Sequence, residues 1–579
     1  MGKLKIGDVK FLALEGGGGK GIAYIGAIRT LEDLRFVHQN GSYDPQNPVP
    51  LFNLSEPIAD RQILGISGAS AGAITAFMLS LGMTSKEIKQ EINKTIPASE
   101  SNWKIWGKAR ECSPAETFLE NPDVETIRWV EPKGNGFKKT STKLAKEALS
   151  GIGNKTFGSS VYYAARLMLW LWPNDWIQEN RNTVLFKRVF EAEQTLGKGF
   201  LIDLLEQTLS NLTSGMGSAL LDVNDNTDTL MKYGESLTNQ LGLFPGKAPR
   251  EYFSQLLTDR LKILNPSLDD VKFRKDKAHS LTFLELFSIT QVDLRLTGVN
   301  ISHQYPFVFS AASTPDFPVV EAICISMNIP FLFKPIYVKG YTTNYFIKPM
   351  RRPADTKPVK KEKRIDKGSK NQKNFPLDGF WVDGGMLNNI PLHVFDGDGM
   401  PTKSSILVNA EGIPILDADG QQQYAEVPKM KLNGENVLGI RLTSGDEERE
   451  PPENNYMTLS KGKEEKVVEK KESELGLLGF IGKLMGTFLE VGESLQIRDQ
   501  ADSDKIIQLY TETMSITDFS SAKMDFQRRD DKEEGMPTKT YNMEGKAIDL
   551  GVLKRKIIGM AGDSVRVYFD EKPEDAPEE

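Results

Sequence analysis

The fold class of this chain is decided by the stretch Ile63-Leu-Gly-Ile-Ser-Gly-Ala-Ser-Ala-Gly72. Its apolar start, 63–66, predicts a buried strand, and apolar residues over 74–81 recur at helical spacing. Between them, Gly68-Ala-Ser70-Ala-Gly72 has the Gly-x-Ser-x-Gly spacing of a nucleophile elbow, a tight turn that exposes a serine hydroxyl. The helix that follows would direct a partial positive charge at Ser70. The alternative interpretation is an ordinary turn of small residues.

The same order of elements occurs earlier in the chain. Residues 9–14 are mostly apolar and predict a short strand, glycines follow, and isoleucines and leucines recur at every third position over 22–34. Two strand–loop–helix units in succession are typical of a parallel sheet with helices packed on its faces. Similar patterns predict further strands at 331–336, 380–382, 437–442 and 506–510, and a helix over 319–327.

A glycine-rich loop joins the first predicted strand to its helix. The loop comprises Gly16, Gly17, Gly18 and Gly19, followed by Lys20 and Gly21. Successive glycines allow neighbouring amide N–H groups to point into one cavity, which suits an anion. A magnesium–nucleotide loop is excluded, because Leu14 occupies its first glycine position and Gly21 stands in place of the required Ser or Thr. A dinucleotide loop and an oxyanion hole both fit the spacing, and an oxyanion hole also explains the serine elbow.

A third motif, Asp383-Gly384-Gly385, directly follows the predicted strand 380–382. A carboxylate at a strand end, beside two glycines, could reach a nucleophile on a neighbouring strand. An aspartate in such a place can also serve only to form a turn. Taken alone, this motif favours the turn-forming role.

Together and in this order, the three motifs resemble those of the patatin-like phospholipase family. The segments Phe309-Ser-Ala-Ala-Ser-Thr-Pro-Asp316 and Ala322-Ile-Cys-Ile-Ser-Met-Asn-Ile-Pro330 are similar to the part of that family that precedes its last catalytic strand. The resemblance implies an α/β fold, a patatin-like three-layer sandwich with a mostly parallel central sheet. The long separation of Ser70 from Asp383 is similar to that in the secreted bacterial effectors of the family.

The resemblance also divides the chain into parts. It implies a catalytic core made of 8–100 and 281–400. The resemblance does not cover 101–280, where tryptophans and helical patterns predict a large helical insertion or cap. A C-terminal extension of the core would occupy 401–570. The acidic, proline-bearing tail 571–579 is expected to be disordered.

The residue roles that the resemblance implies form a Ser–Asp dyad. Ser70 would be the nucleophile and Asp383 the acceptor of its proton, so that an acyl-enzyme forms and is then hydrolysed. Neither a metal nor a cofactor is required by this chemistry. The oxyanion hole would be built by Gly16, Gly17, Gly18 and Gly19, and the supporting motif residues would be Lys20, Gly21, Gly68, Gly72, Gly384 and Gly385.

Two other interpretations stay open. A Ser-His-Asp esterase would need a histidine after the acid, and only His393 qualifies; its apolar neighbours indicate a packed core position instead. A catalytically weak lipid-binding or partner-binding protein could retain the fold, although the intact Ser70 and Asp383 favour an enzyme. Glu15 stands where the family more commonly has Asp or Ser, and we expect little effect from it.

Composition restricts the partners and the location. The formal net charge of −7, from 72 Lys and Arg against 79 Asp and Glu, excludes a general nucleic-acid binder. Two cysteines and four histidines in no paired motif provide neither a disulfide framework nor a metal site. The chain shows no apolar signal core and no apolar run of bilayer length. We therefore expect a cytoplasmic protein, or one exported without a cleaved signal peptide, that associates peripherally with membranes when active.

Membrane contact and a protein partner complete the expectations. The resemblance implies a membrane phospholipid as substrate, and secreted relatives commonly need a eukaryotic protein activator. Residues 475–495 carry apolar residues on one helical face together with helix-weakening glycines, which predicts either core packing or a lid that docks on lipid. The basic stretch 351–373 would then attract anionic headgroups.

Overall fold

A computed structural model of the chain describes residues 3–40, 47–56, 60–94, 113–139 (apart from 119, 122 and 133), 240–343, 375–395, 436–443, 500–511 and 547–570. Short pieces at 44, 96, 236, 405–406, 424–425, 497 and 539–541 are described as well. The stretches 351–373, 475–495 and 571–579 lie outside the described residues, so the predictions of a basic loop, a lid and a disordered tail stay predictions.

The main sheet has ten strands among the described residues. The strands on one side run parallel to their neighbours, in the order β16 (Ile506–Tyr510), β15 (Val437–Thr443), β1 (Phe11–Leu14), β2 (Gly65–Gly68) and β6 (Asp293–Asn300). The other side is mixed and continues with β12 (Gly379–Asp383), β9 (Ile336–Val338), β3 (Thr126–Val130) and β4 (Gly136–Lys139), while β7 (Tyr305–Phe309) pairs with β6. The predicted α/β fold with a mostly parallel central sheet is confirmed.

Strand β1 is buried on both faces, as is usual for a central parallel strand. Leu12 and Leu14 belong to the large core that lies under the helices. Phe11 and Ala13 point to the opposite face, where they pack against apolar side chains of the segment 390–395. The segment that follows the Asp-Gly-Gly motif therefore covers the sheet beside the glycine-rich loop.

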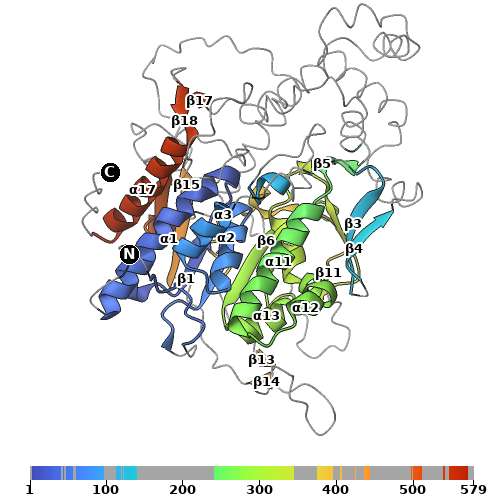
Figure 1. The fold of residues 1–579 in the computed structure, drawn as a ribbon, viewed down its shortest axis with the longest axis horizontal. Helices are drawn as coiled ribbons and strands as arrows, with labels where there is room; N and C mark the ends of the chain where they lie inside the picture. Colours follow the sequence, from blue (N-terminus) through green and yellow to red (C-terminus); the bar gives the residue numbers. More distant parts are fainter. Residues whose placement is uncertain are drawn as a thin grey trace, which may run out of the picture.

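Helices cover the other face, and in Figure 1 α1, α2 and α11 lie in front of the strands. No helix among the described residues combines the length and apolarity needed to cross a bilayer. The helices are α1 (Ala23–Asn40), α2 (Ala71–Ser80), α3 (Ser85–Ile92), α11 (Lys247–Leu264), α12 (Asp270–Asp276), α13 (Phe283–Thr290), α14 (Val319–Ser326), α16 (Gln500–Ser503) and α17 (Leu550–Tyr568). Separate two-stranded pairs are β5 (Gly242–Phe244) with β8 (Phe331–Phe333), β10 (Thr342–Thr343) with β11 (Phe375–Pro376), β13 (Ser405–Ile406) with β14 (Tyr424–Ala425), and β17 (Lys539–Tyr541) with β18 (Ala547–Asp549).

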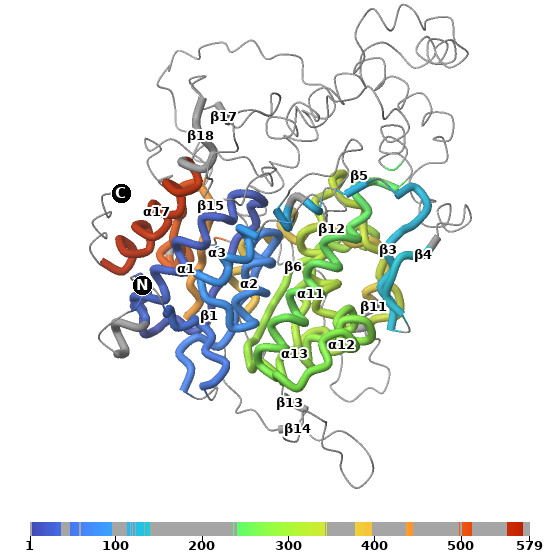
Figure 2. The backbone as a smooth tube through the Cα atoms, in the orientation of Figure 1, coloured from blue at the N-terminus to red at the C-terminus, as the bar shows by residue number. Residues whose placement is uncertain are grey.

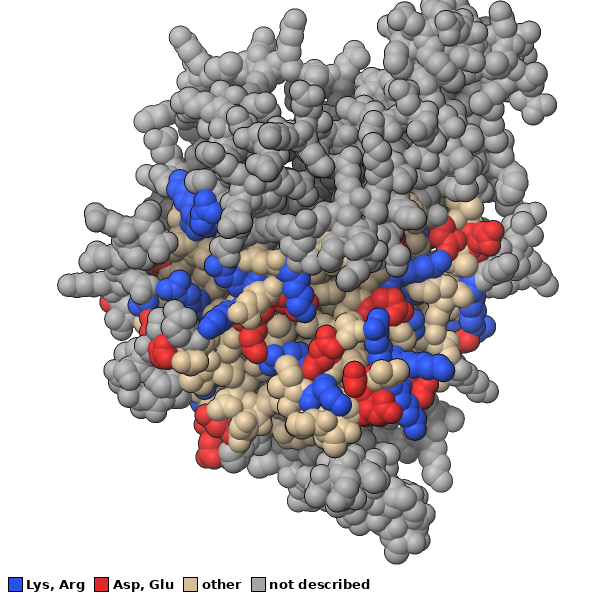
Figure 3. All heavy atoms as spheres, in the orientation of Figure 1, with Lys and Arg blue, Asp and Glu red and all other residues tan. Residues whose placement is uncertain are grey.

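On the face shown in Figure 3, the described surface mixes both signs of charge. Lys and Arg side chains lie among Asp and Glu side chains over the whole described area. Such a surface differs from the basic stripe by which proteins hold nucleic acid.

The prediction of a helical insertion at 101–280 is wrong for three described strands. Strands β3, β4 and β5 lie in this range, and β3 extends the main sheet by pairing parallel to β9. The strand pattern of β3 is hidden because one of its two buried residues is Arg128, a residue type that indicates an exposed position. In the structure Arg128 is buried, and its guanidinium pairs with Glu321 of α14. The placement of the domain boundaries otherwise stays a prediction.

The C-terminal helix α17 packs along α1 and closes the parallel side of the fold (Figure 2). Arg566 of α17 forms an ion pair with Asp33 of α1, with 2.5 Å between Nη2 and Oδ2. The two helices approach most closely at Gly26, where an added β-carbon would overlap the carbonyl group of Ile558. This contact therefore requires glycine.

We predict that Gly26→Ala separates α1 from α17 and destabilises the protein by about 1–3 kcal/mol, the usual cost of overpacking. Gly559→Ala is the matched control, because a β-carbon at this exposed position of α17 meets nothing within 4 Å. Its expected effect is a stabilisation of up to about 1 kcal/mol from helix propensity. Thermal unfolding followed by calorimetry measures both, and equal melting temperatures for the two variants would contradict the close approach.

Candidate active site

The serine elbow joins β2 to α2 with a strained backbone. Ser70 is the N-cap of α2 and has φ 48° and ψ −120°, a positive φ that residues other than glycine rarely adopt. A β-carbon added at Gly68 would overlap the carbonyl group of Gly72. A β-carbon added at Gly72 would overlap the carbonyl group of Leu14. Both glycines of the motif are therefore needed for the turn to form against β1. The strain holds the Ser70 side chain at the head of the helix.

The sheet register brings Asp383 to the level of Ser70. In β6, Leu296 lies opposite Gly68 of β2, whereas Gly298 lies opposite Asp383 of β12. Strand β12 runs antiparallel to β6, so it ends level with the point at which the chain leaves β2 for the elbow. Gly384 then passes so close to Thr297 that a β-carbon there would overlap it. The Asp-Gly-Gly turn is thus held tightly against β6.

Asp383 is buried, and its carboxylate accepts the Gly385 N–H at 2.7 Å. The Ser70 hydroxyl interacts with the same carboxylate and helps to lower its pKa. Burial raises the pKa of Asp383 to about 7, and the hydrogen bonds from Gly385 and Ser70 oppose this rise without cancelling it. The side chain thus changes its protonation state near neutral pH.

The end of α14 and the turn that follows it hold the backbone of both residues. The Ser70 N–H donates to the carbonyl oxygen of Ser326 at 3.0 Å, and the Asp383 N–H donates to that of Asn328 at 2.9 Å. The Asn328 side chain donates in turn to the carbonyl oxygens of Lys334 and Trp381, at 3.0 and 3.3 Å. Helix α14 therefore sets the separation of Ser70 from Asp383. The sequence predicts this helix but does not assign it to the site.

A buried ion cluster holds α14 in place. Glu321 is fully buried and accepts from Arg128 Nε and Arg250 Nε, each at 2.8 Å. Burial alone would raise the pKa of Glu321, but the charges and hydrogen bonds of the two arginines hold that pKa below its usual value. Because Arg128 belongs to β3 and Arg250 to α11, the cluster joins three elements.

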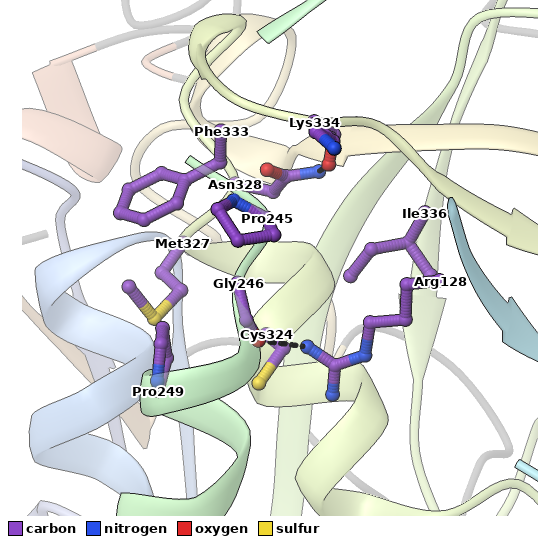
Figure 4. A pocket seen from close by; sticks show the side chains of 10 residues that line it. All are labelled: Arg128, Pro245, Gly246, Pro249, Cys324, Met327, Asn328, Phe333, Lys334 and Ile336. Carbon is purple, nitrogen blue, oxygen red and sulfur yellow. Dashed lines mark hydrogen bonds between the residues drawn. The ribbon is translucent and has the colours of Figure 1, made fainter. Parts of the chain in front are cut away.

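A small pocket lies next to this cluster (Figure 4). Arg128, Cys324, Met327, Asn328 and Lys334 contribute to its lining, and neither Ser70 nor Asp383 does. Arg128 donates across it to the carbonyl oxygen of Gly246 at 3.1 Å. One lining residue, Asn328, also accepts the Asp383 N–H through its carbonyl oxygen.

The glycine-rich loop lies beside Ser70, and its first residue corrects the sequence interpretation. The Gly16 N–H donates to the Asn389 carbonyl oxygen at 3.0 Å, so this amide is engaged inside the protein rather than directed at a ligand. Gly18 has φ 53° and opens a 3-10 helix, η2 (Gly18–Ile22). The amides of Gly18 and Gly19 are the first two of η2, and the helix provides no acceptor for them. Gly17, Gly18 and Gly19 stay the predicted oxyanion donors.

The supporting residues of the loop lie where the motif places them. The Lys20 N–H donates to the Gly17 carbonyl oxygen at 3.1 Å and closes the first turn of η2. Gly21 faces the start of α2, where an added β-carbon would lie 2.9 Å from the β-carbon of Ala71. The glycine-rich loop and the serine elbow therefore pack against each other.

His393 is engaged away from the Ser70 hydroxyl. Its Nε2 lies 3.0 Å from Asp502 Oδ2, whereas the Ser70 hydroxyl interacts with Asp383. This geometry favours the dyad over a Ser-His-Asp triad. Among the described residues, His, Cys, Asp and Glu side chains form no group of three or more that could hold a metal ion.

The chain is similar to a known protein family and to solved structures. Residues 12–396 match a family model described as patatin-like phospholipase, a range that includes the glycine-rich loop, Ser70 and Asp383. Among solved structures, the chain is similar to VipD from Legionella pneumophila at 16% sequence identity, over 97% of this chain and 67% of that one, with a TM-score of 0.26. At this score the two structures are too dissimilar for one to inform the other. No curated protein matches the chain.

We predict that Asp383→Asn stabilises the protein above neutral pH. An unfolded Asp has a pKa of about 3.9, whereas that of folded Asp383 is about 7. The wild-type protein therefore loses stability as the pH rises from about 4 through about 7, because only the unfolded chain releases this proton easily. Asn cannot ionise and can still accept the Gly385 N–H. The melting temperature of the variant should exceed that of the wild type at about pH 8, and this excess should shrink toward about pH 5. A difference that does not change with pH would contradict the raised pKa.

Proposed function

This chain belongs to the patatin-like phospholipase family, and we propose that it is a lipid acyl hydrolase of the phospholipase A type that works through a Ser70–Asp383 dyad. One observation carries the proposal. Ser70, on a strained elbow at the N-cap of α2, and the buried Asp383 donate their backbone N–H groups to carbonyl oxygens only two residues apart, those of Ser326 and Asn328. This brings the serine hydroxyl next to a carboxylate whose pKa lies near neutrality.

The proposed reaction has two acyl-transfer steps. Ser70 Oγ bonds to the carbonyl carbon of a fatty acyl ester while its proton passes to Asp383. The amides of Gly17, Gly18 and Gly19 stabilise the negative charge that develops on the carbonyl oxygen. The bond to the lysophospholipid oxygen then breaks, and this oxygen takes the proton from Asp383.

Hydrolysis of the acyl-enzyme repeats these steps with water. The oxygen of water bonds to the acyl carbon as Asp383 accepts one of its protons, and Ser70 Oγ leaves with that proton as the fatty acid is released. In both steps Asp383 accepts the transferred proton and then returns it. We therefore propose that neither a metal ion nor a cofactor takes part.

The pKa of Asp383 supports its role as general base. A carboxylate with an ordinary pKa of about 4 would be a weak base for a serine hydroxyl. Burial brings the pKa of Asp383 to about 7, close to the value that best serves proton transfer at neutral pH.

We further propose that the substrate is a membrane phospholipid, that the protein associates peripherally with membranes, and that a eukaryotic protein acts as its activator. These proposals rest on the family resemblance. Fatty acid release from mixed phospholipid vesicles, with and without a eukaryotic cytosolic extract, tests them together. Activity that is equal in the two conditions would exclude the activator, while an absence of free fatty acid in both would exclude the hydrolase.

We predict that Ser70→Ala and Asp383→Asn each lower phospholipid turnover by about 10³-fold or more, and that the double variant is little worse than either. Residues that act as one unit give such non-additive losses. His393→Ala is the control and should keep its activity, because His393 pairs with Asp502. Near-normal turnover by folded Asp383→Asn would show that the dyad is wrongly assigned.

The pH profile gives a second prediction. With Asp383 as the base, kcat/KM for a soluble short-chain ester should rise with pH and level off above about 7. His393→Ala should show the same profile. A profile that becomes flat in His393→Ala would instead assign the titration to the histidine and support a Ser-His-Asp esterase.

A further inference from the structure

Glu15 lies between β1 and the glycine-rich loop, with its carboxylate buried and both oxygens engaged. The side chain is 2% exposed. Its Oε1 accepts the side-chain Nδ2 of Asn389 at 3.0 Å, and its Oε2 accepts the backbone N–H of Leu442 in β15. A buried charge is costly unless it is hydrogen-bonded, so these two contacts account for a carboxylate in this place.

The two residues held by Glu15 are the two that confine the start of the loop. A β-carbon added at Gly16 would lie 2.5 Å from Asn389 Oδ1 and 2.9 Å from Ser70 Cβ. A β-carbon added at Gly17 would lie 2.5 Å from Cδ1 of Leu442. Asn389 and Leu442 thus pack against Gly16 and Gly17, two consecutive residues of the loop. Gly16 lies between Asn389 and Ser70.

The backbone of Glu15 is fixed as well. Its N–H donates to the Ile440 carbonyl oxygen in β15 at 3.1 Å, and its carbonyl oxygen accepts the hydroxyl of Tyr24 in α1. The carboxylate therefore projects from a point that two neighbouring elements hold in place.

The orientation of the Asn389 amide depends on this carboxylate. Its Nδ2 donates to Glu15, whereas its Oδ1 is buried and has no hydrogen-bond partner among the described residues. A carboxylate can only accept, so it requires the NH2 group on its own side and directs Oδ1 toward Gly16. The backbone carbonyl of Asn389 then receives the Gly16 N–H.

We propose that Glu15 is a positioning residue for acyl transfer: through Asn389 and Leu442, its carboxylate holds the glycine-rich loop at the distance from Ser70 that oxyanion binding requires. This inference rests on the proposed function. It assigns Glu15 a role where the sequence alone indicated little effect.

A polar exchange between Glu15 and Asn389 tests the proposal. Glu15→Gln must direct its NH2 group at one of two N–H donors, and Asn389→Asp places two carboxylates together. In the double variant Glu15→Gln/Asn389→Asp, the amide introduced at position 15 can donate to the carboxylate introduced at position 389 and accept from Leu442, so both hydrogen bonds return. Each single variant should lower kcat by about tenfold or more, since small displacements of catalytic groups have effects of this size. The change in KM should stay within about twofold. The double variant should recover at least about tenfold of that loss.

The matched control is Glu32→Gln. Glu32 is 1% exposed and accepts from the amide and hydroxyl of Ser85, so it is a buried, hydrogen-bonded glutamate outside the site. Its kcat should equal that of the wild type. Labelling of Ser70 by a fluorophosphonate, which also needs the oxyanion donors, should fall in the single variants and return in the double variant.

Several results would overturn the proposal. One is a folded double variant that turns over no faster than the single variants. Another is a pair of single variants that lose melting temperature while their folded fraction keeps its kcat, which would make Glu15 only structural. If a single variant does not fold, the double variant should regain both folding and turnover, and folding without turnover counts against the proposal. If the fluorophosphonate does not label the wild-type protein, the proposed function is wrong, and the inference that rests on it fails as well.

Discussion

The geometry of the site depends on two backbone hydrogen bonds at the end of α14. The carbonyl oxygens of Ser326 and Asn328 receive the N–H groups of Ser70 and Asp383. A serine on a strained elbow and an aspartate on an antiparallel strand are thereby hydrogen-bonded to the same short segment of the chain. Backbone hydrogen bonds at a helix end satisfy carbonyl groups that the helix itself leaves free. The bond to Ser326 thus caps α14, and together the two bonds fix the positions of Ser70 and Asp383.

The position of α14 depends in turn on charge buried far from the dyad along the chain. Glu321 is held by Arg128 from β3 and Arg250 from α11. Loss of one partner would leave a buried charge unpaired, which is strongly destabilising. The range 101–280, which the sequence predicts to be an insertion, therefore supports the catalytic core through two arginines. Its described part is a component of the core rather than an appendage.

Features that depend on neighbouring residues could be predicted from the sequence, whereas contacts between residues far apart in the chain could not. The turns at Ser70, Gly18 and Asp383 follow from glycines and strand ends within a few residues, and the structure places them together. The engagement of the Gly16 amide could not be predicted, because its acceptor, Asn389, comes much later in the chain. Strand β3 was hidden because Arg128 is inward and neutralised by a distant glutamate. The roles of Glu15 and Leu442 likewise exist only once β15 pairs with β1.

The order of the strands also decides when the molecule is complete during its synthesis. Strand β1 lies between β2, which is translated early, and β15, which is translated after both Ser70 and Asp383. Until residues 437–443 leave the ribosome, β1 has an unpaired edge and Glu15 lacks its Leu442 partner. A nascent chain would therefore carry Ser70 and Asp383 before its glycine-rich loop is anchored. The complete site would form only after residues 437–443 have been translated.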